Sequence, residues 1–197
     1  GRSLELNEAN GWKASFEGLP KYDASGAEIA YTVKEDAVDG YSSAITGDAH
    51  DGFTVTNTST AKVDVPVEKK WVGPAAGEVT VSLKRGDAVV GTLKLSDANG
   101  WNDSFRGLPK YDSQTGEEIA YSLAEEPVEG YDSAVTGDAQ AGFTVTNTST
   151  ATVNVPVEKK WVGPAAEKAV VRLLAGGSDS GRSLELNEAN GWKASFE

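Results

Sequence analysis

The 197-residue chain contains 39% hydrophobic and 24% charged residues, which is the composition of a folded protein and argues against disorder. Its net charge of −12 disfavours nucleic acid and anionic membranes as partners, because binding to either depends on patches of Lys and Arg. Cysteine is absent, which excludes disulfides and thiolate metal sites, and no apolar run approaches the roughly 20 residues that cross a bilayer, so we expect no membrane insertion in this segment.

The sequence repeats itself. The segment 53–60 recurs letter for letter at 143–150, which sets a period of 90 residues, and residues 1–17 are identical to residues 181–197, two periods away. These offsets predict three parts: residues 1–60 are the later part of a repeat, residues 61–150 are a complete repeat, and residues 151–197 are the earlier part of the next.

Taken in chain order, the complete repeat reads as a series of short strands. Apolar residues alternate with polar ones over 63–71, 79–83, 119–123 and 143–147, and turns rich in Gly, Pro, Asn and Asp follow at 72–74, 97–100, 113–116 and 136–138. No segment has a helical stripe with caps. About seven strands in some 90 residues predict an all-β fold, a tandem array of immunoglobulin-like antiparallel β-sandwiches.

Three polar residues fall on the inward phase of these strands: Lys69, Glu125 and Asn147. A buried ammonium and a buried carboxylate are costly, so such residues need mutual pairing or a chemical use. Burial lowers the pKa of a lysine, and a neutral amine could attack the Asn carboxamide while a carboxylic acid polarises its oxygen and passes a proton to the departing ammonia. The product would be a Lys–Asn isopeptide bond, formed without a cofactor or a metal.

The complete repeat resembles the Cna B-type domain, a family of repeats in surface adhesins and pilins of Gram-positive bacteria. The resemblance rests on segments spread over the whole repeat: Val67-Glu68-Lys69-Lys70-Trp71, Gly100-Trp101 through Tyr111-Asp112, Ile119 to Glu125, and Val145-Thr146-Asn147-Thr148. It implies a bond between Lys69 and Asn147, assisted by Glu125. The equivalent residues in the partial repeats are Glu35 and Asn57 in the first and Lys159 in the last.

Two alternatives concern this site. Lys70 is a second candidate for the reacting lysine, but it shares a phase with Glu68 and should face water. The three polar residues could also form a buried salt bridge with a hydrogen-bonded asparagine and no covalent bond. The tryptophans Trp71 and Trp101 could offer a platform for sugars, although their fixed places in the repeat favour core packing.

The resemblance implies a structural stalk or spacer on the bacterial cell surface, anchored to the cell wall through regions outside this fragment, and not an enzyme, since a buried self-cross-link turns over once. A ligand-binding adhesin module is one alternative. Another is a head-to-tail polymer in which Lys159 of one chain bonds Asn57 of the next by strand exchange. The expected partners are neighbouring repeats of the same array.

Overall fold

The computed structural model describes residues 1–197, which form two compact units, one of residues 1–63 with 107–119 and the other of residues 64–106 with 120–197. Each helix is a single 3-10 turn, and none is long and apolar enough to span a membrane. The elements are η1 (Glu8–Asn10), β1 (Tyr41–Asp48), β2 (Gly52–Ser59), β3 (Lys62–Val72), β4 (Val79–Arg85), β5 (Ala88–Leu95), η2 (Asp97–Asn99), β6 (Asn102–Pro109), β7 (Tyr121–Glu125), β8 (Tyr131–Asp138), β9 (Gly142–Ser149), β10 (Val155–Glu158), β11 (Lys168–Ala175), β12 (Ser178–Asn187), η3 (Glu188–Asn190) and β13 (Lys193–Phe196).

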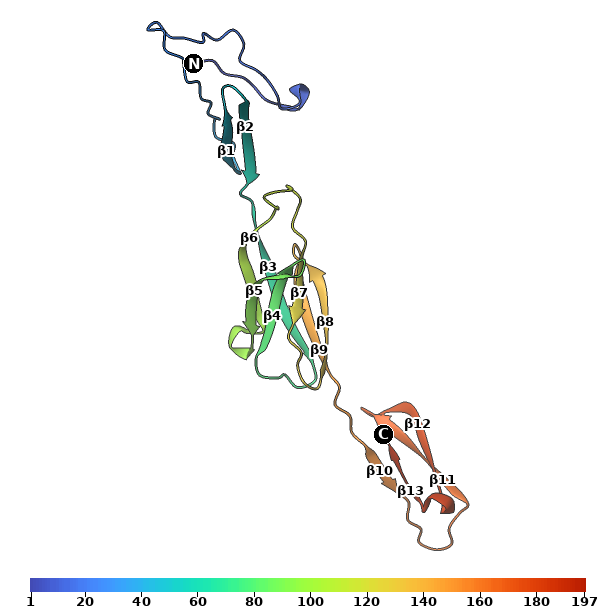
Figure 1. Ribbon diagram of the computed structural model, residues 1–197. Coiled ribbons are helices and arrows are strands. Elements are labelled where there is room, and N and C mark those ends of the chain that lie inside the picture. The colour runs from blue at the N-terminus through green and yellow to red at the C-terminus, as the bar shows by residue number, and fades with distance from the viewer. The chain divides into compact units, whose positions relative to one another are not determined.

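The seven strands β3 to β9 build a β-sandwich from the complete repeat. One sheet has four strands in the order β6-β3-β9-β8, and the other has three in the order β5-β4-β7. Figure 1 shows these strands gathered into one two-layered body. The prediction of an immunoglobulin-like sandwich with about seven strands is confirmed.

The first and last strands of the repeat, β3 and β9, are parallel neighbours in the four-stranded sheet, with Val67 opposite Phe143 and Trp71 opposite Asn147. The sequence analysis expected antiparallel sheets, and the pairs β4–β5, β4–β7 and β8–β9 are antiparallel. Parallel neighbours cannot be joined by a hairpin, and here the whole intervening repeat connects them. The pairing therefore places the first and last strands of the repeat side by side, while the chain enters the sandwich at one end and leaves it at the other.

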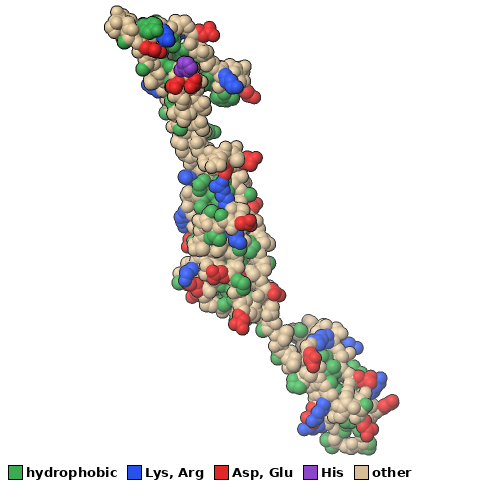
Figure 2. All heavy atoms as spheres, viewed as in Figure 1, with side chains coloured by type: hydrophobic (Ala, Val, Ile, Leu, Met, Phe, Trp, Pro, Cys, Tyr) green, Lys and Arg blue, Asp and Glu red, His purple; other side chains and the backbone are tan.

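Alternating side chains fill the space between the sheets, as the period of two predicts. Val65, Val81, Leu83 and Val145 have no exposed surface. β-Branched residues suit this position because their stiff side chains pack well on a pleated sheet. In Figure 2 acidic and basic side chains are interspersed on the visible surface of the sandwich. Among the buried residues, the polar or charged ones are Lys69 and Asn147.

The two flanking segments contain strand pairs that match some of those in residues 61–150. Residues 1–60 contain the hairpin β1–β2, which matches β8–β9 in register, with Ser43 opposite Asn57 as Ser133 is opposite Asn147. Residues 151–197 contain two antiparallel pairs, β10–β13 and β11–β12, with Leu186 and Phe196 buried. Both segments also leave large apolar side chains exposed, among them Leu4, Leu6, Val153 and Val170.

Candidate functional site

The three polar residues singled out in the complete repeat come from three strands. Lys69 on β3 lies opposite Val145 of β9, so Asn147, two residues further along β9, is its diagonal neighbour on the same face of the sheet. Glu125 ends β7, in the facing sheet. Its carboxylate reaches across the core, with Oε1 3.4 Å from Lys69 Nζ.

This site is closed to water. The side chains of Lys69 and Glu125 are 0% and 1% exposed, and Asn147 is fully buried. The Lys69 amine donates to two backbone carbonyl oxygens, those of Lys70 at 3.2 Å and Val145 at 3.5 Å. Together with the ion pair to Glu125, these two hydrogen bonds hold Nζ in one place.

Burial lowers the pKa of Lys69 from its ordinary value, because the protein interior solvates an ammonium ion poorly. The Glu125 carboxylate acts in the opposite direction by favouring the charged amine, but the effect of desolvation is larger. The 3.4 Å contact is within ion-pair distance, yet it is not aligned as a hydrogen bond, so neither carboxylate oxygen has a hydrogen-bond donor. Lys69 consequently loses its proton to form the neutral amine more readily than a lysine at the surface does.

The side chain of Asn147 has no hydrogen-bond partner at either Nδ2 or Oδ1, although both atoms are buried. An unsatisfied buried amide costs about 1–3 kcal/mol per group, so it needs an explanation. A second carboxamide shows what such a group can contact: in residues 1–60, Asn57 Nδ2 donates to Glu35 Oε1 over 3.0 Å. These are the residues equivalent to Asn147 and Glu125.

Aromatic rings cover the amine. Lys69 Nζ lies 4.2 Å from the centre of the Trp71 ring, and Trp71 makes edge-on contacts with Trp101 at 5.3 Å and Tyr131 at 5.0 Å. The sequence analysis assigned Trp71 only to core packing. The signal that it contacts the lysine was its spacing, because residues two apart on a strand lie on one face.

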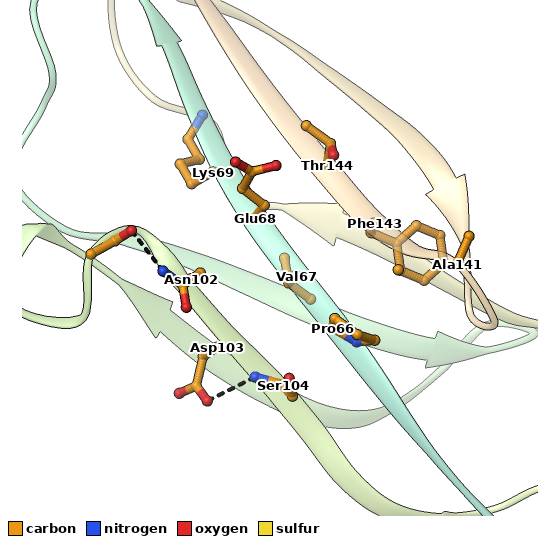
Figure 3. A pocket seen from close by; sticks show the side chains of 12 residues that line it. Pro66, Val67, Glu68, Lys69, Asn102, Asp103, Ser104, Ala141, Phe143 and Thr144 are labelled. Atoms are coloured by element: carbon orange, nitrogen blue, oxygen red, sulfur yellow. Dashed lines mark hydrogen bonds between the residues drawn. The ribbon is translucent and has the colours of Figure 1, made fainter.

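Lys70, the competing lysine, lies on the opposite side of β3. Its side chain is 55% exposed and pairs with Glu68 over 3.1 Å. Figure 3 shows Lys69 and Glu68 leaving β3 in different directions. The depression in that view is lined by backbone and side chains of β3, β6 and β9, including Pro66, Asn102 and Thr144.

The partial repeats each hold a part of this arrangement. Lys159 Nζ lies 4.2 Å from the Trp161 ring, and Trp161 contacts Trp192 at 5.3 Å, the same distances as around Lys69. Lys159 is only half-buried, however, and donates to the carbonyl oxygen of Lys160. Glu35 and Asn57 form the exposed pair described above, so each segment contains only some of the residues that correspond to Lys69, Glu125 and Asn147.

Comparison with known proteins assigns the fold to a family. The family model described as the Cna protein B-type domain matches residues 1–58 and 65–148, which is more than half of the chain. The chain belongs to this family. The second matched range, 65–148, contains Lys69, Glu125 and Asn147.

The chain is also similar to individual proteins. The Collagen adhesin of Staphylococcus aureus is 30% identical over 207 residues, covering 98% of this chain but only 17% of that protein. The crystal structure of two B repeat units of the collagen-binding protein of S. aureus is 30% identical, with a TM-score of 0.47, and covers 100% of this chain and 55% of that one. The pilus adhesin SpaC of Lactobacillus rhamnosus GG is 16% identical, with a TM-score of 0.39, over 76% of this chain and 21% of that one.

Proposed function

We propose that this chain is part of the stalk of a cell-surface adhesin or pilus-like fibre, and that each complete repeat is locked by an isopeptide bond between its first and last strands. The bonded residues are Lys69 and Asn147, and Glu125 is the catalytic residue. The reaction happens once per repeat, so the chain is a structural protein and not an enzyme. We further propose that the array is extracellular and held at the bacterial cell wall by regions outside these residues, and that residues 1–60, 61–150 and 151–197 are its successive repeats or parts of them.

The reaction follows from the geometry. Glu125 takes a proton from the Lys69 ammonium across the 3.4 Å contact, and the neutral Nζ attacks Cγ of Asn147. The bond between Cγ and Nδ2 then breaks as Glu125 gives its proton to the leaving nitrogen and takes a second proton from the attacking Nζ, so that ammonia departs and Glu125 is left protonated. One N–C bond forms, one breaks, and no oxidant or cofactor is needed.

The observation that carries this proposal is the buried carboxamide of Asn147 without a hydrogen-bond partner, on the same face as a buried amine. A purely structural salt bridge with a hydrogen-bonded asparagine would leave no such group unsatisfied. Bond formation removes the part of this cost that belongs to Nδ2, which leaves as ammonia, and it turns the buried amine into an uncharged amide.

The position of the bond suits a stalk. It would join β3 to β9, the first and last strands of the repeat, so tension applied at the two ends would pass through covalent bonds and not through the sheet. By analogy with a disulfide that closes a loop of this size, it would stabilise the repeat by about 4–5 kcal/mol.

Intact mass measures the bond directly. We expect the folded chain to be lighter than its sequence by about 17 Da, one ammonia, for the complete repeat. Lys69→Ala and Glu125→Ala should each restore the full mass. The matched control is Lys70→Ala, which removes the adjacent, outward-facing lysine and should keep the loss. Full mass in the folded wild-type chain would rule the bond out, and a loss that persists in Lys69→Ala would show that Asn cyclisation, not cross-linking, releases the ammonia.

A second candidate is a head-to-tail polymer. Lys159 lies in a segment with the equivalents of β3 to β6, and Glu35 and Asn57 lie in a segment with the equivalents of β8 and β9. The exposed apolar side chains of both segments favour association. We propose that two copies of the chain can complete one sandwich between them, with Lys159 of one bonded to Asn57 of the other.

A further inference from the structure

Trp101 has an unusual backbone. Its φ is +60°, directly after Gly100 at +62°, and the corresponding Trp12 and Trp192 have φ of 58° and 62°. A bulky residue in the left-handed region is an outlier, and such outliers cluster at functional sites. Glycine would occupy this position without strain, so the indole must contribute something that offsets the strain.

The turn that imposes this backbone is built locally. Asn99 Oδ1 accepts from the N–H of Ser96 at 3.0 Å, and Asn99 Nδ2 donates to the carbonyl oxygen of Lys94 at 2.8 Å. The N–H of Trp101 then closes the turn on the carbonyl oxygen of Ser96 at 2.9 Å. These local hydrogen bonds therefore set the direction in which the indole leaves the backbone, without any contact with the core.

That direction leads to the lysine. The carbonyl oxygen of Trp101 accepts from the backbone N–H of Lys69 at 2.7 Å, and its indole meets the Trp71 ring at 5.3 Å with the planes 77° apart. Lys69 Nζ lies 4.2 Å from the centre of that second ring. Trp101 thus acts on Lys69 in two ways. Its carbonyl oxygen holds the backbone of Lys69, and its indole packs against Trp71, the ring over which the Lys69 amine lies.

The same arrangement exists where no bond partner is present. In residues 151–197, the N–H of Lys159 donates to the carbonyl oxygen of Trp192 at 2.8 Å, the indoles are 5.3 Å apart, and Nζ lies 4.2 Å from the Trp161 ring. The equivalents of Glu125 and Asn147 belong to strands that this segment lacks. The aromatic pair and the carbonyl oxygen of Lys160 therefore position this lysine without equivalents of Glu125 and Asn147.

We propose that Trp101 is a positioning residue for isopeptide formation, which holds the Lys69 amine in place through Trp71 before Glu125 and Asn147 join the site. This inference rests on the proposed function. It predicts that Trp101→Gly, which relieves the backbone strain and removes the indole, slows bond formation at least about tenfold while the repeat still folds, because a misplaced nucleophile reacts slowly. Trp101→Tyr keeps an aromatic ring and should recover most of the rate.

The test starts from chain isolated unfolded and unbonded in guanidinium, diluted into buffer, and follows the loss of about 17 Da with time by mass spectrometry. Trp12→Gly is the matched control, because it relieves the same strain at a tryptophan that is 66% exposed, and its rate should equal that of the wild-type chain. Equal rates in Trp101→Gly and wild type would overturn the inference while leaving the bond established.

A second measurement does not depend on the bond. The ε-methylene protons of Lys69 should be shifted upfield in NMR spectra by the Trp71 ring, in bonded chain and in Glu125→Ala alike. Trp101→Gly should abolish this shift and Trp101→Tyr should retain it. A shift unchanged in Trp101→Gly would show that Trp71 is held by other contacts and would refute the positioning role, whether or not the bond forms.

Discussion

At the scale of residues, the site depends on the protonation of one amine. Lys69 is buried, and desolvation lowers its pKa despite the nearby carboxylate of Glu125. Only the unprotonated amine has the lone pair that the proposed attack on Asn147 requires. A lysine with the ordinary pKa near 10.4 is almost wholly protonated at neutral pH, so we infer that the lowered pKa is what would allow the proposed reaction there.

The rate of bond formation should therefore fall as pH falls through this lowered pKa, and its midpoint should lie clearly below about 10.4. Refolding the unbonded chain over a series of pH values, with mass as the readout, gives the midpoint. Tryptophan fluorescence at each pH checks that the repeat has folded, so that slow folding is not mistaken for slow chemistry. A midpoint at or above that of free lysine would contradict an amine activated by burial.

At the scale of elements, the hairpin β8–β9 carries Asn147, and its end depends on glycine. Gly137 has φ +94°, and a Cβ there would lie 2.1 Å from the carbonyl oxygen of Gly142. Gly130 also has a positive φ, +79°, but a Cβ there would meet no atom within 4 Å. The two positions separate backbone strain from steric clash.

Gly130→Ala should cost about 1 kcal/mol of the free energy of unfolding, from backbone strain alone. Gly137→Ala should cost clearly more, because the hairpin must also open to relieve the clash. Guanidinium unfolding measures both, in a Glu125→Ala background so that a cross-link does not mask the difference. Similar losses for the two variants would mean that the hairpin relaxes around the added methyl group without cost.

At the scale of the whole molecule, we propose that the segments 1–60 and 151–197 are complementary parts of a repeat. The duplication of residues 1–17 at 181–197 means that either copy of this segment could occupy the same place in a sandwich completed by two chains. Association of this kind depends on concentration, and a covalent Lys159–Asn57 bond would make it permanent.

On a denaturing gel, the concentrated chain should then give a ladder of multiples of its 20.6 kDa mass. Lys159→Ala should abolish the ladder, since it removes the nucleophile, and Lys160→Ala, which alters the neighbouring lysine, should keep it. A single band at all concentrations would exclude this covalent linkage. The cross-link inside residues 61–150 would be unaffected, because it uses Lys69.

Much of this protein could be predicted from its sequence. The 90-residue period defined the repeat, and the alternation of apolar residues defined the strands and their inward faces, because the side chains of a strand alternate between its two faces. The same alternation put Lys69 inside and Lys70 outside. These properties are local or periodic, so sequence alone determined them.

Other features depended on contacts between distant segments. The parallel pairing of β3 with β9, the 3.4 Å approach of Glu125 from the facing sheet and the unpartnered carboxamide of Asn147 involve residues tens of positions apart. The left-handed backbone of Trp101 and its contact with Trp71 were also unforeseen, because tryptophan has no preference for that conformation. The sequence determined which residues face the core; only the tertiary structure decided which of them meet, since that depends on how the two sheets pack.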